Sequence, residues 1–388
     1  HHEFLLGYCR EFGIALEPFI NDNRAALMHS PTAFGGQPQL ARRVITDARG
    51  NIAELLATAI NQGALDQALS AADRANVLAM LQSFGNLTGG FAYTGSSRAG
   101  FPGQENAGSR QRGDSLSPLD LAELASETFF QLRADFLESF DQQATMLQPV
   151  GGMDRIAQAF EARVAANIVF EAEVSEIRKT ADGARVVYSD RLGAVRTVDA
   201  DYCVCTIPAT VLRSIANDFS ANYATAIAAF NYTQATKIAF QSRRFWEQDH
   251  NIYGGISWTN QNITQLWYPS AGLGRSQGII VGSYIFGGTA GTDFTNQSVQ
   301  QRIASTVSQA NAVHPVFGSE VSRGISVAWP KVPFQLGGWG VSDPGILLTP
   351  DDSIFFAGEH LSILQGWQEG AILSAYHAID GIVSRDSV

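Results

Sequence analysis

The segment Ser353–Ser374, SIFFAGEHLSILQGWQEGAILS, carries the residues best placed to do chemistry. Ile354–Phe356 are apolar and predict a buried strand of the parallel type, after which Ala357-Gly358 lets the backbone turn closely. Glu359 then lies at the carboxyl end of that strand, where α/β sheets bind ligands. Gly366 opens a helix whose first N–H groups lack partners within the helix, and such an end attracts an anion or an electron-rich carbonyl.

Lys237 is the second chemical candidate, because it interrupts TKIAF, an otherwise apolar or small strand. A lysine in such a strand is costly unless its ammonium has a partner. Cys203 and Cys205 alternate within an apolar run and are expected to pack as small hydrophobic residues. Cys9 is the third cysteine, and seven scattered histidines show no ligand spacing, so we expect neither a disulfide scaffold nor a metal site.

The composition narrows the classes of protein that this chain of 388 residues can represent. A formal net charge of −11 argues against non-specific binding of nucleic acid, which needs clustered Lys and Arg. Hydrophobic residues make up 45%, which excludes disorder, yet no apolar run reaches the roughly 18 residues of a membrane span. We therefore expect two or three domains with a large core, no nucleic acid partner and no membrane.

The first part of the chain shows mainly helical periodicity. Residues 3–15 form an amphipathic stripe that Gly13 is placed to end, and residues 51–92 are helical, with a capping pattern at Ser70. Residues 95–117 lack periodicity and predict a long loop, either a lid or a mobile surface segment. Helical periodicity returns over 118–146.

Sequence patterns typical of β-strands dominate the rest of the chain. PVGGMDRIAQAF predicts a glycine turn entering a helix, and strands follow on both sides of a hairpin turn at Asp182-Gly183. Short strands over 236–240, 252–258, 263–268 and 279–285 predict a second, mixed sheet; residues 298–312 are helical, and a strand, a turn and a helix close the chain. The order predicts an α/β plus α+β protein with interleaved domains.

The string FAGE-x(6)-GW-x-x-GA within Ser353–Ser374 resembles the C-terminal flavin-binding signature of the flavin-containing amine oxidases. Segments that resemble the family in order and spacing are PVGGMDRI (149–156), EAEVSEI (171–177), DADYCVCTIP (199–208), ATKIAF…RFW (235–246) and AWPKVPFQLGGW (328–339). The amino end is most similar to L-amino acid oxidases. The resemblance implies a Rossmann-like FAD domain and a mixed-sheet substrate domain with a helical insertion.

The same resemblance divides the chain into five segments. It implies a substrate-domain segment at 1–36, a helical domain at 37–147 that contains the 95–117 loop, an FAD-binding segment at 148–230, the mixed-sheet substrate domain at 231–345, and a C-terminal FAD-binding segment at 346–388.

No G-x-G-x-x-G fingerprint occurs anywhere in the sequence, although the family holds the FAD diphosphate with one. The arginine that clamps the substrate carboxylate in the family is missing as well. We therefore expect a second chain, cut from the same precursor, to supply both, with two such two-chain units forming a dimer. The competing interpretation is a degenerate relative that binds no flavin.

Residue roles follow from the resemblance, position by position. Lys237 matches a lysine that holds a water at the flavin, Tyr284 matches a tyrosine that bonds the substrate carboxylate, and Gly366 matches the glycine whose carbonyl accepts the substrate amine. The implied catalytic residues are Lys237 and Trp367; the substrate-binding residues are Tyr284, Gly366, Trp367 and Trp339; the cofactor-binding residues are Val174, Trp329, Gly358, Glu359, Gln368, Gly370 and Ala371.

Each role has a plainer alternative. Val174 is equally a core strand valine, Lys237 a surface lysine, Glu359 a solvated turn carboxylate, Tyr284 a buried strand tyrosine and Trp339 a packed core aromatic.

The resemblance implies oxidation of an L-amino acid by FAD and O₂ to a 2-oxo acid, ammonia and hydrogen peroxide. Gly337-Gly338-Trp339 carries no cysteine, so we expect non-covalent FAD. Alternatives are a monoamine or polyamine oxidase, an amino acid 2-monooxygenase, and a flavin-free binding or scaffold chain. The sequence leaves the cellular location undetermined, with a secreted or periplasmic location slightly favoured over the cytoplasm.

Overall fold

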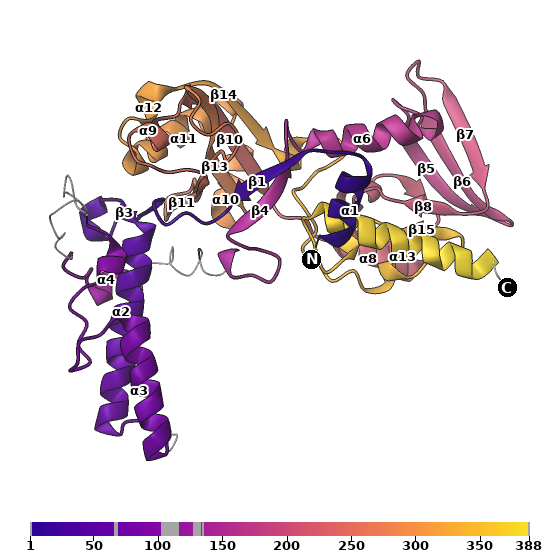
Figure 1. Cartoon of the computed structure of the whole chain (residues 1–388). Coiled ribbons are helices and arrows are strands. Elements are labelled where there is room, and N and C mark those ends of the chain that lie inside the picture. The colour runs from indigo at the N-terminus through magenta and orange to yellow at the C-terminus, as the bar shows by residue number, and fades with distance from the viewer. Residues whose placement is uncertain (1, 66–68, 102–115, 127–132, 134–135, 387–388) are drawn as a thin grey trace.

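A computed structural model of the chain describes residues 2–65, 69–101, 116–126, 133 and 136–386. Figure 1 shows a central sheet region, a two-helix arm that projects from one side of it, and a second region on the other side that contains the C-terminal helix. The predicted 95–117 loop falls mostly on residues 102–115, which lie outside the described residues.

The central region is a seven-stranded mixed sheet. Its strand order is β14-β10-β13-β12-β11-β2-β3, and neighbouring strands run antiparallel except for the parallel pair β11 and β2. Ile238 and Phe240 are buried on one face of β10, whereas Lys237 lies on the other, accessible face. The strands are β2 Leu27–His29, β3 Gln39–Leu40, β10 Ala235–Arg243, β11 Gly255–Thr259, β12 Gln265–Tyr268, β13 Gln277–Phe286 and β14 Val321–Ala328.

Helix α11 (Val299–Val313) packs against the buried face of this sheet and confirms the helix predicted over 298–312. Ser298 caps it, because its hydroxyl accepts the N–H of Gln301 and the Gln301 side chain accepts the N–H of Ser298. Three shorter helices belong to the same region: α9 Phe245–Gln248, α10 Gly288–Asn296 and α12 Phe317–Glu320.

The second region combines a four-stranded sheet, of order β7-β6-β5-β9, with a parallel pair, β15 and β8. The predicted hairpin is confirmed, with its turn one residue earlier than predicted: Thr180 pairs with Gly183, the first residue of β6, across Ala181-Asp182. The parallel strand predicted at Ile354–Phe356 is also confirmed as β15. The remaining strands are β5 Glu173–Thr180, β6 Gly183–Ser189, β7 Val195–Ala200, β8 Cys203–Cys205 and β9 Ala216–Asn217.

Helices cover these sheets and connect the regions. Helix α1 (Glu3–Glu11) packs against the 19-residue helix α13 (Gln368–Asp386), and Gly13 follows α1 with a φ of 68°, as predicted for its end. The others are α6 Asp154–Val164, α7 Ala209–Leu212 and α8 Ala221–Ala229, with 3₁₀ turns at Phe34–Gly36, Ser97–Ala99, Ala165–Asn167, Trp329–Lys331, Gly345–Leu348 and Glu359–Leu361.

The projecting arm is the helix pair α2 (Ala41–Gln62) and α3 (Ala71–Gly85) (Figure 1). Ser70 caps α3 by accepting the N–H of Asp73, as predicted. Gly85 allows the helices to approach closely, because a Cβ there would lie 2.4 Å from the Cβ of Ala53. The arm has its own buried cluster, made of Ala53, Ala57, Ile60, Leu78, Leu81, Leu87 and Tyr93.

The helical prediction over 118–146 is wrong at its end. Leu121–Ser126 form helix α4, but Thr145–Pro149 form strand β4, which pairs antiparallel with β1 (Leu16–Ile20). Pairing with a strand far away in sequence overrides the local periodicity here. None of the helices in the described part of the chain is both long enough and apolar enough to cross a bilayer.

Candidate functional site

A cavity opens on the accessible face of the seven-stranded sheet, beside the β1–β4 ribbon. It has a volume of about 310 Å³ and opens to solvent, and both Lys237 and Tyr284 line it. The other lining residues are Phe19, Gln148, Trp267, Tyr268, Pro269, Ser270, Ala271, Ile279 and Val281. The structure therefore brings two of the predicted site residues into one hollow.

Lys237 and Tyr284 face each other across β10 and β13. The two residues pair in the antiparallel register, and the Lys237 Nζ lies 4.2 Å from the centroid of the Tyr284 ring. Within the described residues Lys237 makes no ion pair, so this aromatic face is the partner of its ammonium. Solvent reaches Lys237 through the open cavity, yet desolvation by the surrounding protein still lowers the pKa of its ammonium.

The Tyr284 hydroxyl is a hydrogen-bond donor with no partner among the residues the structure describes. Burial raises the pKa of Tyr284 to about 12, so the hydroxyl stays protonated at neutral pH. A protonated, unpaired hydroxyl in a cavity suits a ligand that accepts a hydrogen bond, such as a carboxylate.

Aromatic rings that were not predicted for the site form one wall of the cavity. Phe19 of β1 stacks on Trp267 of β12, with ring centroids 5.8 Å apart and planes at 10°. The Trp267 indole N–H donates to Oε1 of Gln265 at 2.7 Å, which fixes the orientation of the ring. Trp267 lies in the strand predicted over 263–268, whereas no strand was predicted around Phe19, and no local signal reveals that β1 and β12 meet.

A chain of ring contacts connects this cavity to the C-terminal glycine turn. Tyr284 and Phe286 have ring centroids 5.3 Å apart, and Phe286 and Trp339 have centroids 5.7 Å apart. Trp339 in turn lies against Gly366, where a Cβ would come within 3.3 Å of its indole Cγ. Tyr284, Trp339 and Gly366, all predicted to bind substrate, are thus linked through Phe286.

Glu359 holds the turn together from the end of β15. Its Oε2 accepts the N–H of Gly366 at 2.7 Å, and its Oε1 accepts the N–H of Gly340 at 3.1 Å. Burial raises the pKa of Glu359, and these two N–H donors oppose that shift by stabilising the charged form. Glu359 is therefore a partly buried carboxylate with backbone partners, which differs from the alternative of a fully solvated turn residue.

Helix α13 begins two residues after Gly366, at Gln368. The first N–H groups of this helix were expected to lack partners, with Gly370 and Ala371 among the residues that bind the cofactor, but the N–H groups of these two both donate to the carbonyl of Trp367, at 3.1 and 3.4 Å. That expectation is wrong because the helix closes one turn over Trp367. The amides of Gln368 and Glu369 are the ones without a partner in the described part of the chain, and the helix dipole makes that end positive.

The other predicted residues lie outside the cavity. The Trp367 indole N–H donates to Oδ2 of Asp141 at 2.6 Å, and its ring meets His2 edge-on at 4.8 Å. Trp329 is half-buried at the end of β14. Val174 lies in β5, where it packs against the core of the second region.

Cys203 and Cys205 pack inside the parallel pair, as predicted. Burial raises the pKa of both thiols, that of Cys205 to about 12, so neither is a reactive thiolate. Within the described residues no group of three His, Cys, Asp or Glu side chains is arranged to hold a metal ion.

Comparison with known proteins places the chain among flavoproteins. The family described as flavin containing amine oxidoreductase matches residues 1–382. The flavin-dependent L-tryptophan oxidase RebO of Lentzea aerocolonigenes is 30% identical over 256 residues, which cover 62% of this chain and 54% of that protein. An L-amino-acid oxidase of Mus musculus is 28% identical over 242 residues, covering 59% and 38%. The chain thus spans about half the length of the curated relatives that it matches first.

Solved structures support the fold. Cyclohexylamine oxidase from Brevibacterium oxydans superposes with a TM-score of 0.63 over 100% of this chain and 86% of that chain, at 14% identity. Putrescine oxidase bound to putrescine superposes with a TM-score of 0.60 over 98% and 86%, also at 14% identity. The predicted class, α/β plus α+β with a helical insertion, is confirmed.

Proposed function

Because this chain belongs to the flavin-containing amine oxidoreductase family, we propose that it forms the larger part of an FAD-dependent L-amino acid oxidase. Relatives that share 28–30% identity are named as oxidases of L-amino acids or of L-tryptophan. One observation carries the proposal: the cavity presents the ammonium of Lys237 and the unpaired hydroxyl of Tyr284 within an aromatic wall. A hydroxyl donor in an aromatic cavity suits the carboxylate and side chain of an amino acid.

The residues at the start of α13 fit a flavin. The unpaired amides of Gln368 and Glu369, at the positive end of a helix of 19 residues, suit the electron-rich edge of the ring. Gly358, Glu359, Gly370 and Ala371 shape the adjoining turn, and we assign Val174 and Trp329 to the rest of the cofactor. Bound FAD would supply the acceptor for the hydride from Cα of the substrate and the route of electrons to O₂.

The chain itself positions the substrate. Tyr284 would donate to the substrate carboxylate and the carbonyl of Gly366 would accept the amine, which orients Cα. Trp339 and Trp367 would bound the pocket on either side of that glycine. The ammonium of Lys237 would hold a water molecule, and no side-chain base is needed if the amine binds neutral. The overall products would be a 2-oxo acid, ammonia and hydrogen peroxide.

We further propose that polypeptide outside these 388 residues completes the dinucleotide-binding domain and supplies the carboxylate-binding arginine. Two facts support this. The sequence has no G-x-G-x-x-G, and the parallel sheet has two strands in the described part of the chain, fewer than a dinucleotide-binding sheet contains. Cofactor binding would be non-covalent, because all three cysteines lie away from Gly337-Gly338-Trp339.

Oxidation of simple amines is the second candidate, because the similar folds belong to putrescine and cyclohexylamine oxidases. An amino acid 2-monooxygenase and a flavin-free scaffold chain complete the alternatives. The test incubates the completed assembly with L-amino acids and, separately, with amines, and assays peroxide and 2-oxo acid. We expect a yellow protein that releases both products from L-amino acids. Turnover of amines alone would reject the proposal, and a colourless, inactive assembly would favour the scaffold.

A further inference from the structure

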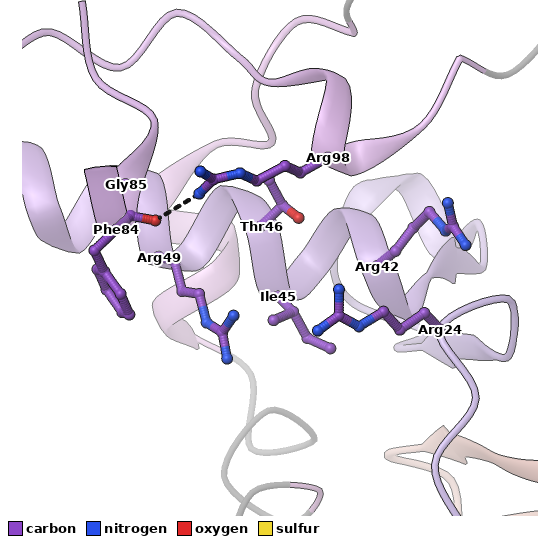
Figure 2. A pocket seen from close by; sticks show the side chains of 8 residues that line it. All are labelled: Arg24, Arg42, Ile45, Thr46, Arg49, Phe84, Gly85 and Arg98. Atoms are coloured by element: carbon purple, nitrogen blue, oxygen red, sulfur yellow. Dashed lines mark hydrogen bonds between the residues drawn. The ribbon is translucent and has the colours of Figure 1, made fainter. Parts of the chain in front are cut away.

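Four arginines from separate parts of the chain line a second cavity, at the base of the α2–α3 arm (Figure 2). Arg24 lies in the segment before β2, Arg42 and Arg49 lie on α2, and Arg98 lies in the 3₁₀ turn Ser97–Ala99. The enclosed volume of the cavity is about 40 Å³, the hollow continues into open solvent, and its other lining residues are Ile45, Thr46, Phe84 and Gly85. It shares no lining residue with the cavity that contains Lys237.

No carboxylate from the described part of the chain lines this cavity. Within the described residues the guanidinium groups of Arg24, Arg42 and Arg49 make neither an ion pair nor a hydrogen bond. The Arg98 guanidinium donates to the carbonyl of Phe84 at 3.0 Å, as the dashed line in Figure 2 shows, and Arg49 lies 5.6 Å from the Phe84 ring centroid. Four positive charges therefore share one hollow without a counterion among the residues that the structure describes.

Counterions are available elsewhere in this chain, which has 37 acidic residues. The neighbouring Arg43, on another side of α2, pairs with Asp47 at 3.7 Å, and Arg133 is paired with Asp22. The absence of acidic side chains from the cavity is thus a local feature, in a protein whose net charge is −11. Such a local positive field concentrates multivalent anions.

The start of α2 adds to the positive field. Its first turn has no acidic residue and contains Arg42, so the positive helix end and the arginine repel each other. The amides of Ala41 and Arg42 donate to the carbonyls of Ala26 and Arg24, at 2.8 and 3.0 Å. These bonds hold the backbone of Arg24 beside the helix, so the positions of the arginines are set by the fold.

The spacing of the charges indicates the shape of the ligand. Arg42 and Arg49 are seven residues apart on one helix, a rise of about 10 Å. A chain of two or three linked phosphates covers a length of this order, so it could contact guanidinium groups placed along the helix. Guanidinium groups bind phosphate oxygens in pairs of parallel hydrogen bonds, which favours arginine at such sites. We propose that this cavity binds a short polyphosphate, either free or as the phosphate chain of a nucleotide.

Calorimetric titration of the 388-residue chain with tripolyphosphate, pyrophosphate and inorganic phosphate tests the proposal. We expect saturable binding that is tightest for tripolyphosphate and weakest for phosphate, and that weakens as salt is added. The double variant R42Q/R49Q should lower the tripolyphosphate affinity at least tenfold. Arg74→Gln, an exposed arginine farther along the same arm, is the matched control and should change it less than twofold.

Three outcomes of the titration would overturn the proposal: no saturable heat of binding, equal affinity for all three anions, or a loss of tripolyphosphate affinity in Arg74→Gln as large as that in R42Q/R49Q. Sedimentation with phosphatidic acid vesicles, with and without tripolyphosphate, distinguishes a lipid headgroup as the source of phosphate. If the chain binds the vesicles but not free polyphosphate, the proposal is contradicted. It is also contradicted if the chain is a dimer without phosphate and R42Q/R49Q makes it a monomer, because the arginines would then bind a second copy of the chain. Circular dichroism checks that each variant is folded. If R42Q/R49Q does not fold, the single variant Arg49→Glu replaces it and is expected to abolish binding of tripolyphosphate.

Discussion

Glu369 and Leu5 are hydrogen-bonded although 364 positions separate them: the N–H of Leu5 donates to Oε2 of Glu369 at 2.7 Å. The other carboxylate oxygen accepts the N–H of Phe4 at 3.0 Å, and Glu369 is 1% exposed. A side chain in the first turn of α13 thus satisfies two of the amides that open α1, amides that have no partner within their own helix. This carboxylate attaches the amino-terminal helix next to the proposed flavin site.

Replacing Glu369 by Ala should lower the free energy of unfolding by about 2–4 kcal/mol, because the buried carboxylate and its bonds to two part-buried N–H groups are lost. Chemical denaturation measures the change. Asp380→Ala removes an exposed carboxylate from the same helix and should change stability by less than about 0.5 kcal/mol. Equal effects of the two substitutions would show that Glu369 does not fasten α1.

Two glycine substitutions should act in opposite directions. A Cβ on Gly370 would lie 2.2 Å from Oγ of Ser362 and 2.4 Å from the carbonyl oxygen of Leu364, so Gly370→Ala should destabilise by at least about 2 kcal/mol. Gly7 lies within α1, and no atom would come within 4 Å of a Cβ there. Gly7→Ala should therefore stabilise by about 0.5–1 kcal/mol. Thermal unfolding of the two variants checks both signs.

Tyr284→Phe should raise KM for an L-amino acid by about tenfold or more, the cost of one hydrogen bond to a charged group. The pKa of Tyr284, raised to about 12, keeps the donor protonated, so the effect should persist across the neutral pH range. Steady-state kinetics of the completed assembly measure it, with exposed Tyr253→Phe as control. An unchanged KM would remove Tyr284 from the substrate site.

Lys237→Met should slow reoxidation of the reduced enzyme by O₂ by about 10²-fold while it leaves KM for the amino acid within about twofold. Stopped-flow mixing with oxygen measures the rate, and exposed Lys331→Met is the control. Because desolvation lowers the pKa of Lys237, the wild-type rate should fall at a lower alkaline pH than an ordinary lysine would give. A reoxidation rate that changes neither in Lys237→Met nor with alkaline pH would contradict the proposed role of the Lys237 ammonium.

Stability should decline as the pH falls below about 6.5. Burial lowers the pKa of His314 to about 3 and that of His360 to about 4, so between these values and 6.5 the unfolded chain binds more protons than the folded one. Each buried histidine then contributes a slope of up to about 1.4 kcal/mol per pH unit. His314→Phe should flatten the measured slope, whereas the same change at exposed His377 should leave it as it was.

Features with local causes could be predicted from the sequence. The cap at Ser70, the hairpin around Asp182-Gly183 and the strand Ile354–Phe356 each depend on neighbouring residues, and the structure confirms them. Strand β4 was missed, since Thr145–Pro149 take their conformation from a partner about 130 positions away. Local preference decides a conformation only where no distant partner competes.

The candidate site could likewise be predicted only where its residues stand out from their neighbours in the sequence. Lys237 is conspicuous in an apolar strand, and the motif that contains Glu359 is continuous in sequence. The stack of Phe19 on Trp267 and the capping of α1 by Glu369 join residues that no spacing relates. The cavity arginines are likewise spread over 75 positions, from Arg24 to Arg98, and only the fold gathers them.

The α2–α3 arm has its own buried cluster and meets the central sheet at one end. The length of the arm can therefore change, in evolution or by design, independently of the central sheet. Inserting matched seven-residue repeats at the tip would extend the reach of the hairpin by about 10 Å each, without disturbing the strands that hold Lys237. A peptide tag or fluorescent reporter grafted at that tip would sit far from the chemistry and would leave it intact.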